Sequence, residues 1–252
     1  GSGHSFTSIA CSDDVLVSLE HLNMVRSIGW RSRLVTVQAG IELRHLNNRL
    51  AKVGLAMTNL GDIAYQSFAG AVSTGTHGTG LAFTGIAAQI RGMRVVTATG
   101  EIVDCSTEQN PELFHVARVG LGAFGIISEI TIEVEPAFNL HAIEGPRPLI
   151  EVLDGWHEET TSNDHFEFFW IPGSDVAMTK TNQRTTDAVN RQSVPKHFVD
   201  KILGENVAFG AMVKVAKVRP SLIPKLRSLL INSVGDSDYT AESHRVFASP
   251  RW

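Results

Sequence analysis

Residues 67–80 read Ser67-Phe-Ala-Gly-Ala-Val-Ser-Thr-Gly-Thr-His-Gly-Thr-Gly80, a run of glycines and hydroxyl side chains with almost no charge. Glycines let the backbone approach a ligand closely and adopt turns closed to other residues, so successive N–H groups can converge on anionic oxygens. The hydroxyls add hydrogen-bond donors without charge. A Gly/Thr-rich surface loop would have the same composition. A second run of this kind, Gly1-Ser-Gly-His-Ser5, favours phosphate-binding loops over that alternative.

The composition of the 252 residues, 43% hydrophobic and 19% charged, is that of a globular chain with room for one large or two modest domains. A net charge of −4 without a Lys/Arg cluster argues against nucleic acid or an anionic membrane as partner. Cys11 and Cys105 are too few for a disulfide framework or a thiolate metal site, so we expect no metal and a cytoplasmic location. No apolar run is long enough to span a membrane. The chain opens inside a glycine loop without an initiator Met and stops at Trp252, so we expect a segment of a longer protein.

The first part of the chain alternates strand-like and helix-like patterns. Short β-branched or Leu-rich runs at 15–19 and 34–38 predict strands, with 23–29 as their connection. Leucines at helical spacing predict an amphipathic helix over 41–53, with Gly54 as its C-cap. The other expected elements of this part are strands at 90–98, 101–105 and 126–134, a hairpin turn at Thr99-Gly100, and a helix at 113–119 that starts at Asn110-Pro111.

The composition of the chain changes after Pro136, where the glycine-rich loops end. An aromatic strand is expected at 165–171. The polar stretch 179–193 predicts a long exposed connection. Two helices are expected beyond it, at 196–218 and 221–231, with Pro220 separating them.

The stretch Gly120-Leu-Gly-Ala-Phe-Gly125 matches the dinucleotide-binding fingerprint letter for letter. That fingerprint requires a strand before it and a helix after it, because the helix N-terminus meets the pyrophosphate. Here a predicted helix precedes the glycines and a predicted strand follows them. We therefore favour a tight helix-to-strand turn, with or without ligand contact, over a Rossmann motif.

With its glycine segments in this order, the chain resembles the PCMH-type flavin-binding domain of the vanillyl-alcohol oxidase superfamily. Within it, the chain is similar to the sugar-1,4-lactone oxidases (gulono-, galactono- and arabinono-lactone oxidases) and to the alditol oxidases. The resemblance is carried by Gly1-Ser-Gly-His-Ser-Phe6, Asn59-Leu-Gly61, Ala69-Gly70, Thr74-Gly-Thr-His-Gly-Thr-Gly80 and Gly122-Ala-Phe-Gly-Ile-Ile127. Later stretches, Phe166-Glu-Phe-Phe-Trp-Ile-Pro172 and Ser243-His-Arg-Val-Phe-Ala-Ser-Pro250, resemble the lactone-oxidase cap domain.

The resemblance implies an α+β fold and two domains. Residues 1–137 would form an FAD-binding domain of two α+β subdomains that lacks its N-terminal part. Residues 138–252 would form a sheet-and-helix substrate domain, or cap, that lacks its C-terminal part. The implied cofactor is FAD.

The resemblance also implies which residues contact FAD. The first loop would hold the pyrophosphate, and His4 would be bonded covalently to the flavin 8α-methyl, since a neutral imidazole is nucleophilic enough for that attack. The alternative is that His4 only donates a hydrogen bond to phosphate. We expect His77 to make a structural hydrogen bond and not to act as a catalytic base. The implied contacts are Gly1, Ser2, Gly3, His4, Ser5, Ser67, Gly70, Ala71, Val72, Ser73, Thr74, Gly125 and Ile126.

Two residues bear on the reaction. By resemblance Gly61 lies over the flavin edge where oxygen approaches, which favours an oxidase, although a turn after Asn59-Leu60 would equally require a glycine. Asp62 stands where alditol oxidases carry a small hydroxyl residue near substrate, and this departure favours a lactone.

The implied reaction passes a hydride from a carbinol carbon of a sugar-1,4-lactone to flavin N5, and O2 or another acceptor then reoxidises the flavin. We expect the catalytic base and the substrate-positioning residues beyond Trp252. The alternatives are an alditol (xylitol-type) oxidase and an FAD-binding segment without turnover.

Overall fold

The computed structural model describes residues 2–190, 210, 213–215, 217–223, 225, 231 and 235–248. The chain divides into two compact units. The first unit comprises Gly1–Gly78, Phe83–Ala137 and Phe247–Ser249, and the second comprises Thr79–Ala82, Phe138–Val246 and Pro250–Trp252.

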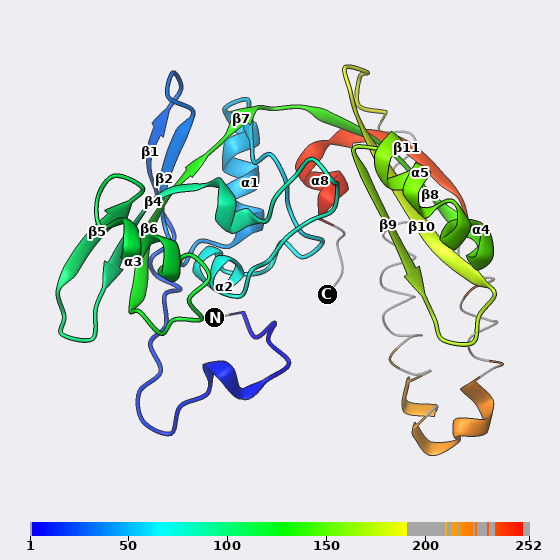
Figure 1. The fold of residues 1–252 in the computed structure, drawn as a ribbon, viewed down its shortest axis with the longest axis horizontal. Helices are drawn as coiled ribbons and strands as arrows, with labels where there is room; N and C mark the ends of the chain where they lie inside the picture. The colour runs from blue at the N-terminus through cyan, green and yellow to red at the C-terminus, as the bar shows by residue number, and fades with distance from the viewer. Residues whose placement is uncertain are drawn as a thin grey trace. The chain divides into compact units, whose positions relative to one another are not determined.

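The first unit is built on a five-stranded sheet with the strand order β1-β2-β6-β4-β5 (Figure 1). Its neighbouring strands are all antiparallel. Ile130 and Ile132 on the central strand are fully buried, while Glu129 and Glu133 on the same strand form ion pairs with arginines. The bounds of the strands are β1 Val25–Gly29, β2 Leu34–Gln38, β4 Ile90–Val96, β5 Ile102–Ser106 and β6 Ile126–Glu133.

Helices and short turns complete the first unit. The predicted amphipathic helix is confirmed: Leu43, Leu46 and Leu50 of α1 are at most 1% exposed, and Gly54 follows it with a left-handed φ of 70°. The hairpin at Gly100 and the helix that begins at Pro111 are confirmed as well. The bounds are α1 Leu43–Lys52, α2 Phe68–Ser73, α3 Pro111–Ala117, the 3-10 turns η1 Ser8–Ala10 and η2 Ile86–Gln89, and the paired short strands β3 Leu55–Ala56 and β7 Glu135–Pro136.

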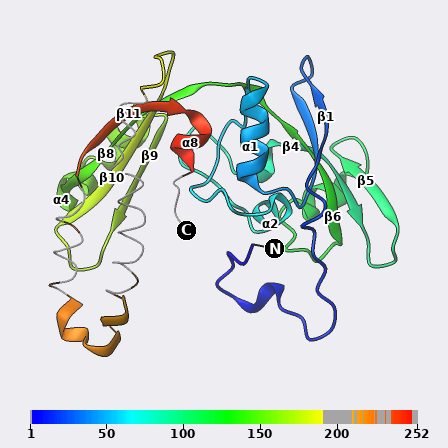
Figure 2. The ribbon, with the colours of Figure 1, turned by 180° about the vertical axis from the view of Figure 1, so that it is seen from behind.

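The second unit is a four-stranded antiparallel sheet with the order β11-β8-β10-β9. The helices α4 and α5 cover one of its faces, as the opposite views of Figures 1 and 2 show. Val152 of α4 packs there against Phe166 and Ala177 of the sheet. The bounds are β8 Asn139–Pro148, α4 Leu149–Asp154, α5 Trp156–Ser162, β9 His165–Trp170, β10 Val176–Thr185, η3 Pro220–Leu222, β11 Ser237–Glu242 and α8 Ser243–Phe247.

The strand predicted at 15–19 is wrong. Val15, Leu16 and Val17 are more than half exposed and lie outside any strand, whereas the segment taken as a connection contains β1, Val25–Gly29. A strand needs a partner, and β1 has one in β2. A short apolar run by itself does not say whether a partner exists.

The exposed connection predicted at 179–193 is also wrong. Most of its first half belongs to β10, which pairs with β8 on one side and β9 on the other. Two polar side chains of this strand are buried with partners: Thr179 Oγ1 donates to the Gly145 carbonyl at 3.1 Å, and Lys180 Nζ donates to the Val246 carbonyl at 2.7 Å. Polarity is therefore no measure of exposure here, because buried polar groups are tolerated when hydrogen-bonded. The predicted helices at 196–218 and 221–231 lie mostly outside the described residues.

Among the described helices, none combines the length and the apolar character needed to cross a bilayer. In that same part of the chain, His, Cys, Asp and Glu side chains form no group of three able to hold a metal ion.

Candidate functional site

The second and third glycine segments lie side by side in the first unit. The amide of Leu121 donates a hydrogen bond of 3.2 Å to the carbonyl of Ser73, the last residue of α2. A Cβ on Gly75 would lie 3.5 Å from Val119 Cγ1, which confirms the close approach. The turn over 120–125 joins helix α3 to strand β6, so its context is helix then strand, as the sequence predicts.

Gly125 holds this turn against the sheet. Its φ is 127°, and a Cβ there would lie 2.4 Å from the Val96 carbonyl oxygen, so only glycine fits. Ile126 follows it as the first residue of β6 and is 37% exposed.

The first glycine segment is open to solvent. Ser2, Gly3, His4 and Ser5 are all exposed, and Gly1 lies outside the described residues. Gly3 has a left-handed φ of 71°, and a Cβ there would meet no atom within 4 Å. That this loop joins the other two around one cofactor stays a prediction.

Most backbone amides in and around α2 donate hydrogen bonds to carbonyl groups of the protein. The amides of Phe68 and Ala69 donate to the carbonyls of Ile41 and Ala39, each at 2.8 Å. Ala71 and Val72, both predicted FAD contacts, are fully buried and form part of the core. The amides that donate to protein carbonyls are those of Phe68, Ala69, Ala71, Gly75 and Thr76. These amides are therefore not aimed at an anion.

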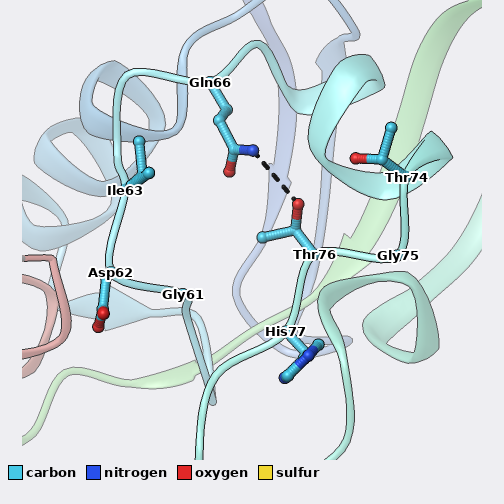
Figure 3. Close-up of a pocket in the computed structure, with 8 residues that line it drawn as sticks. All are labelled: Gly61, Asp62, Ile63, Gln66, Thr74, Gly75, Thr76 and His77. Carbon is cyan, nitrogen blue, oxygen red and sulfur yellow. Dashed lines mark hydrogen bonds between the residues drawn. The ribbon is translucent and has the colours of Figure 1, made fainter. Parts of the chain in front are cut away.

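A cavity of about 370 Å³ lies between residues 61–66 and 74–77. Figure 3 shows the residues that line it. It brings together four residues singled out from the sequence, Gly61, Asp62, Thr74 and His77, although these come from two different segments. The lining residues are Gly61, Asp62, Ile63, Gln66, Thr74, Gly75, Thr76 and His77.

Close packing between residues 59–61 and 76–78 explains why Gly61 and Gly78 are glycines. A Cβ on Gly61 would lie 2.9 Å from the His77 carbonyl oxygen. A Cβ on Gly78 would lie 2.1 Å from the Leu60 carbonyl oxygen, which is far inside van der Waals contact. The two segments approach so closely that neither position accepts a larger residue without movement of the backbone.

Gln66 lines the cavity and was missed by the sequence analysis. Its Nε2 donates to Thr76 Oγ1 at 3.4 Å, as drawn in Figure 3. Its Oε1 is buried and has no hydrogen-bond partner among the described residues. The only sequence signal for Gln66 is its position immediately before the glycine-rich stretch 67–80. That position alone does not predict a role for its side chain.

His77 makes the structural hydrogen bond expected of it. Its Nδ1 lies 2.9 Å from the carbonyl oxygen of Gly78. Since a carbonyl only accepts, Nδ1 carries the proton, and in the neutral ring Nε2 is then a hydrogen-bond acceptor.

A second polar cluster lies on the sheet of the second unit. The Lys180 ammonium is 8% exposed and lies 3.9 Å from Glu144 Oε1 and 3.7 Å from Glu167 Oε1. The Tyr239 hydroxyl donates to Glu144 Oε1 at 3.0 Å, and burial together with that carboxylate raises the tyrosine pKa far above its usual range. This cluster was missed because Lys180 was assigned to an exposed connection.

Two family models match the chain. The model described as an FAD binding domain matches residues 1–106, and the model described as D-arabinono-1,4-lactone oxidase matches residues 130–252.

Relatives named for lactone oxidation match over long stretches. An L-gulono-1,4-lactone dehydrogenase of Mycobacterium tuberculosis is 38% identical over 254 aligned positions, which cover 100% of this chain and 58% of that protein. A putative D-arabinono-1,4-lactone oxidase of Neurospora crassa is 36% identical, covering 89% of this chain and 41% of that protein. An L-gulonolactone oxidase of Bos taurus is 35% identical, covering 75% of this chain and 44% of that protein. The chain thus spans about half the length of these relatives.

Among solved structures, a cholesterol oxidase variant from Brevibacterium sterolicum matches with a TM-score of 0.72. The match covers 98% of this chain and 53% of that one, at 16% sequence identity. At this identity the likeness establishes the fold alone, which is the α+β, PCMH-type FAD-binding fold expected from the sequence.

Proposed function

Because the chain belongs to the FAD-binding family of sugar-1,4-lactone oxidases and dehydrogenases, we propose that it takes part in oxidising a sugar-1,4-lactone of the gulono, galactono or arabinono type. The bound flavin would supply the ring that accepts a hydride from the carbinol carbon of the substrate. The observation that carries the proposal is the contact of two glycine turns, through Leu121 and Ser73, in the same unit as a cavity that Gly61 and Asp62 line.

The residues around this cavity fit a flavin cofactor. Gln66 Oε1 is a buried acceptor that the described protein does not satisfy, and burying such a group without a partner is unfavourable. Glycines at positions 61 and 75 keep the lining free of bulk. A bound group that offers hydrogen-bond donors would satisfy the glutamine and fill the cavity.

We propose that this group is held by the three glycine segments. Residues 2–5 would contact it from the first segment, Ser67, Gly70, Ser73 and Thr74 from the second, and Gly125 with Ile126 from the third. His4, in the open first loop, would bond covalently to the flavin, because a neutral imidazole is a competent nucleophile. His4 is exposed, which leaves its ring accessible to a ligand.

We propose O2 as the electron acceptor, with Gly61 leaving the approach open. The packing of Gly61 against the His77 carbonyl gives a separate reason for a glycine at this position, so the residue alone does not distinguish an oxidase from a dehydrogenase.

The test uses the purified flavoprotein under anaerobic conditions with a panel of L-gulono-, L-galactono- and D-arabinono-1,4-lactone and xylitol. We expect at least one lactone to bleach the visible flavin absorbance and xylitol to leave it unchanged. Admission of oxygen should then restore the colour quickly, whereas a dehydrogenase would need an added dye. A protein that holds FAD but is bleached by none of the lactones contradicts the proposal.

A further inference from the structure

We propose that two copies of this chain associate head to tail through two complementary surfaces, a basic patch on the first unit and an acidic patch on the second. Neither surface needs flavin or substrate, so this association is independent of the proposed function. The basic patch comprises Trp30, Arg31, Arg33, Arg49 and Lys52. The acidic patch comprises Ile150, Glu151, Leu153, Asp154, Trp156 and Glu158.

The fold assembles the basic patch from two segments that are separate in the sequence. The turn between β1 and β2 supplies the tryptophan and two arginines, and the last turn of α1 supplies Arg49 and Lys52. The β1–β2 turn lies against the end of the helix, because a Cβ on Gly54, which follows α1, would lie 3.9 Å from Trp30 Cη2. Trp30 is 57% exposed, and the four cations of the patch are exposed as well.

The cations of the basic patch have no counter-ions. None of them forms an ion pair with a described residue. The helix dipole favours cations at the C-terminal end of α1, which accounts for Arg49 and Lys52. It does not account for two arginines and an exposed tryptophan in the neighbouring turn, and these residue types are enriched in protein interfaces. The other arginines of this unit have partners: Arg26, Arg44, Arg91 and Arg94 pair with carboxylates, and Arg118 lies over the Phe114 ring.

The acidic patch lies on helices α4 and α5. Val152 of α4 packs against the sheet, whereas the three large apolar side chains of the patch are 47%, 51% and 64% exposed. Its three carboxylates are exposed and form no ion pair with a described residue, in contrast to the neighbouring Glu159, which pairs with Arg147. Exposed apolar side chains with polar groups around them mark an interaction surface.

Charge complementarity favours a second copy of the chain as the partner. Every copy carries both patches, so two copies always present unpaired cations to unpaired carboxylates. Arginine binds carboxylates bidentately, and contact between the exposed tryptophan and the apolar side chains of the acidic patch would remove apolar surface from water. The net charge of −4 on each copy opposes this contact only weakly, because salt at about 0.15 M screens charges more than about 8 Å apart.

A lipid surface fits the basic patch less well. Trp30 is the one large apolar side chain of this patch, whereas anchoring at a membrane interface needs a broad apolar face. Contact between unlike patches is heterologous, so it closes into a dimer if both contacts form at once and otherwise repeats along an open chain. In either case the mass should rise with protein concentration and fall with salt.

The experiment measures sedimentation velocity of the purified protein from about 1 to about 100 µM, at about 0.05 M and about 0.5 M NaCl. We expect species heavier than the monomer at high protein concentration in low salt, and monomer alone in high salt. Arg49→Glu with Lys52→Glu should abolish the association, and so should Glu151→Lys with Asp154→Lys, because each pair of changes makes the facing patches alike in charge. An equimolar mixture of these two variants should associate again, because unlike patches are then available to each other.

The matched control is Glu101→Lys with Glu108→Lys. It changes the net charge by the same amount as the acidic-patch variant, at two exposed glutamates outside both patches. This control should associate as the wild type does. Far-UV circular dichroism checks that each variant is folded.

A wild-type protein that stays monomeric at about 100 µM in low salt would overturn the proposal. Association that survives either charge reversal would overturn it as well, as would a mixture of the two variants that stays monomeric. A monomeric wild type that sediments with vesicles of anionic phospholipid, and loses this binding in Arg49→Glu with Lys52→Glu, would assign the basic patch to a lipid surface instead.

Discussion

The amide of Leu121 donates a hydrogen bond of 3.2 Å to the carbonyl of Ser73, and this bond joins two glycine turns that are far apart in the sequence. Leu121 adopts a left-handed φ of 54°, a conformation that costs a branched residue about 1 kcal/mol or more. Strain of this kind persists only where the surrounding structure fixes it.

Replacement of Leu121 by proline removes the amide proton and demands a negative φ. We expect Leu121→Pro to lose about 2 kcal/mol of unfolding free energy and to weaken flavin binding, measured by urea denaturation and by flavin titration. Leu121→Asn is the control, because asparagine tolerates the left-handed region and keeps the amide. Equal stability of the two variants would mean that this bond does not hold the turns together.

Substitution of Gly78 tests how closely residues 59–61 and 76–78 approach each other. A Cβ there would lie 2.1 Å from the Leu60 carbonyl oxygen, so Gly78→Ala should cost about 3 kcal/mol. Gly85→Ala is the matched control, since Gly85 has an ordinary φ of −65° and a Cβ there would meet nothing closer than 3.5 Å. Its effect should stay within about 0.5 kcal/mol in the same denaturation experiment. A stable Gly78→Ala protein would show that the two segments lie farther apart.

Lys180 stabilises the second unit through its buried ammonium. Lys180→Met leaves Glu144 and Glu167 without their shared cation and the Val246 carbonyl without its donor, so we expect a loss of about 3 kcal/mol. Arg26→Met is the control, because the Arg26 pair with Glu129 is partly exposed and should contribute about 1 kcal/mol or less. A small effect of Lys180→Met would mean that water reaches the carboxylates.

The buried His165 should make the protein less stable in mild acid. Burial lowers its pKa below the ordinary 6.5, opposed by the Thr79 carbonyl that its Nδ1 contacts at 2.9 Å and by Asp164, and reinforced by Arg184 and Lys180. Near pH 6 the unfolded chain therefore binds more protons than the folded one. Stability is complete above about pH 7 and falls as the pH drops through 6.5 towards the folded-state value.

The measurement is the urea midpoint at pH 8 and at pH 5.5 for the wild-type protein and for His165→Asn. The wild type should lose more stability on acidification than the variant, whose side chain does not titrate. Burial also lowers the pKa of His244, which contributes in the same direction, so part of the slope should remain. An identical slope in both proteins would show that His165 is as easily protonated folded as unfolded.

Covalent attachment of the flavin predicts a simple chemical result. On acid precipitation the yellow colour should stay with the wild-type pellet and move to the supernatant in His4→Ala. His21→Ala is the control, because His21 is an exposed histidine of the same N-terminal region and should retain the colour. Colour that stays with denatured His4→Ala protein would exclude His4 as the attachment residue.

Several elements of this fold could be read from the residues alone because their signals are local. The leucines of α1 repeat at the helical period, the turn at Gly100 demands a left-handed residue, and β6 alternates between isoleucines and charged or polar side chains. The same kind of signal failed for β1 and β10, whose identity as strands depends on partners elsewhere in the chain.

Some residues of the candidate site could also be predicted from the sequence, and others could not. The family resemblance carried by the glycine segments predicted a flavoprotein fold, and it singled out Gly61, Asp62 and Thr74. It could not find Gln66, because whether an amide oxygen is buried without a hydrogen-bond partner depends on the residues that the fold places around it. Nor could it separate amides that are free for a ligand from those already bonded to carbonyls, such as Phe68 and Ala69.

The amino-acid sequence by itself determined where the chain turns and which faces of its helices are apolar, since both depend on neighbours a few positions away. Only the tertiary structure decided which glycines are required by packing, which polar strand lies inside a sheet, and which side chains meet at the cavity. Those properties depend on contacts between residues distant in the sequence, and periodicity along the chain carries no information about them.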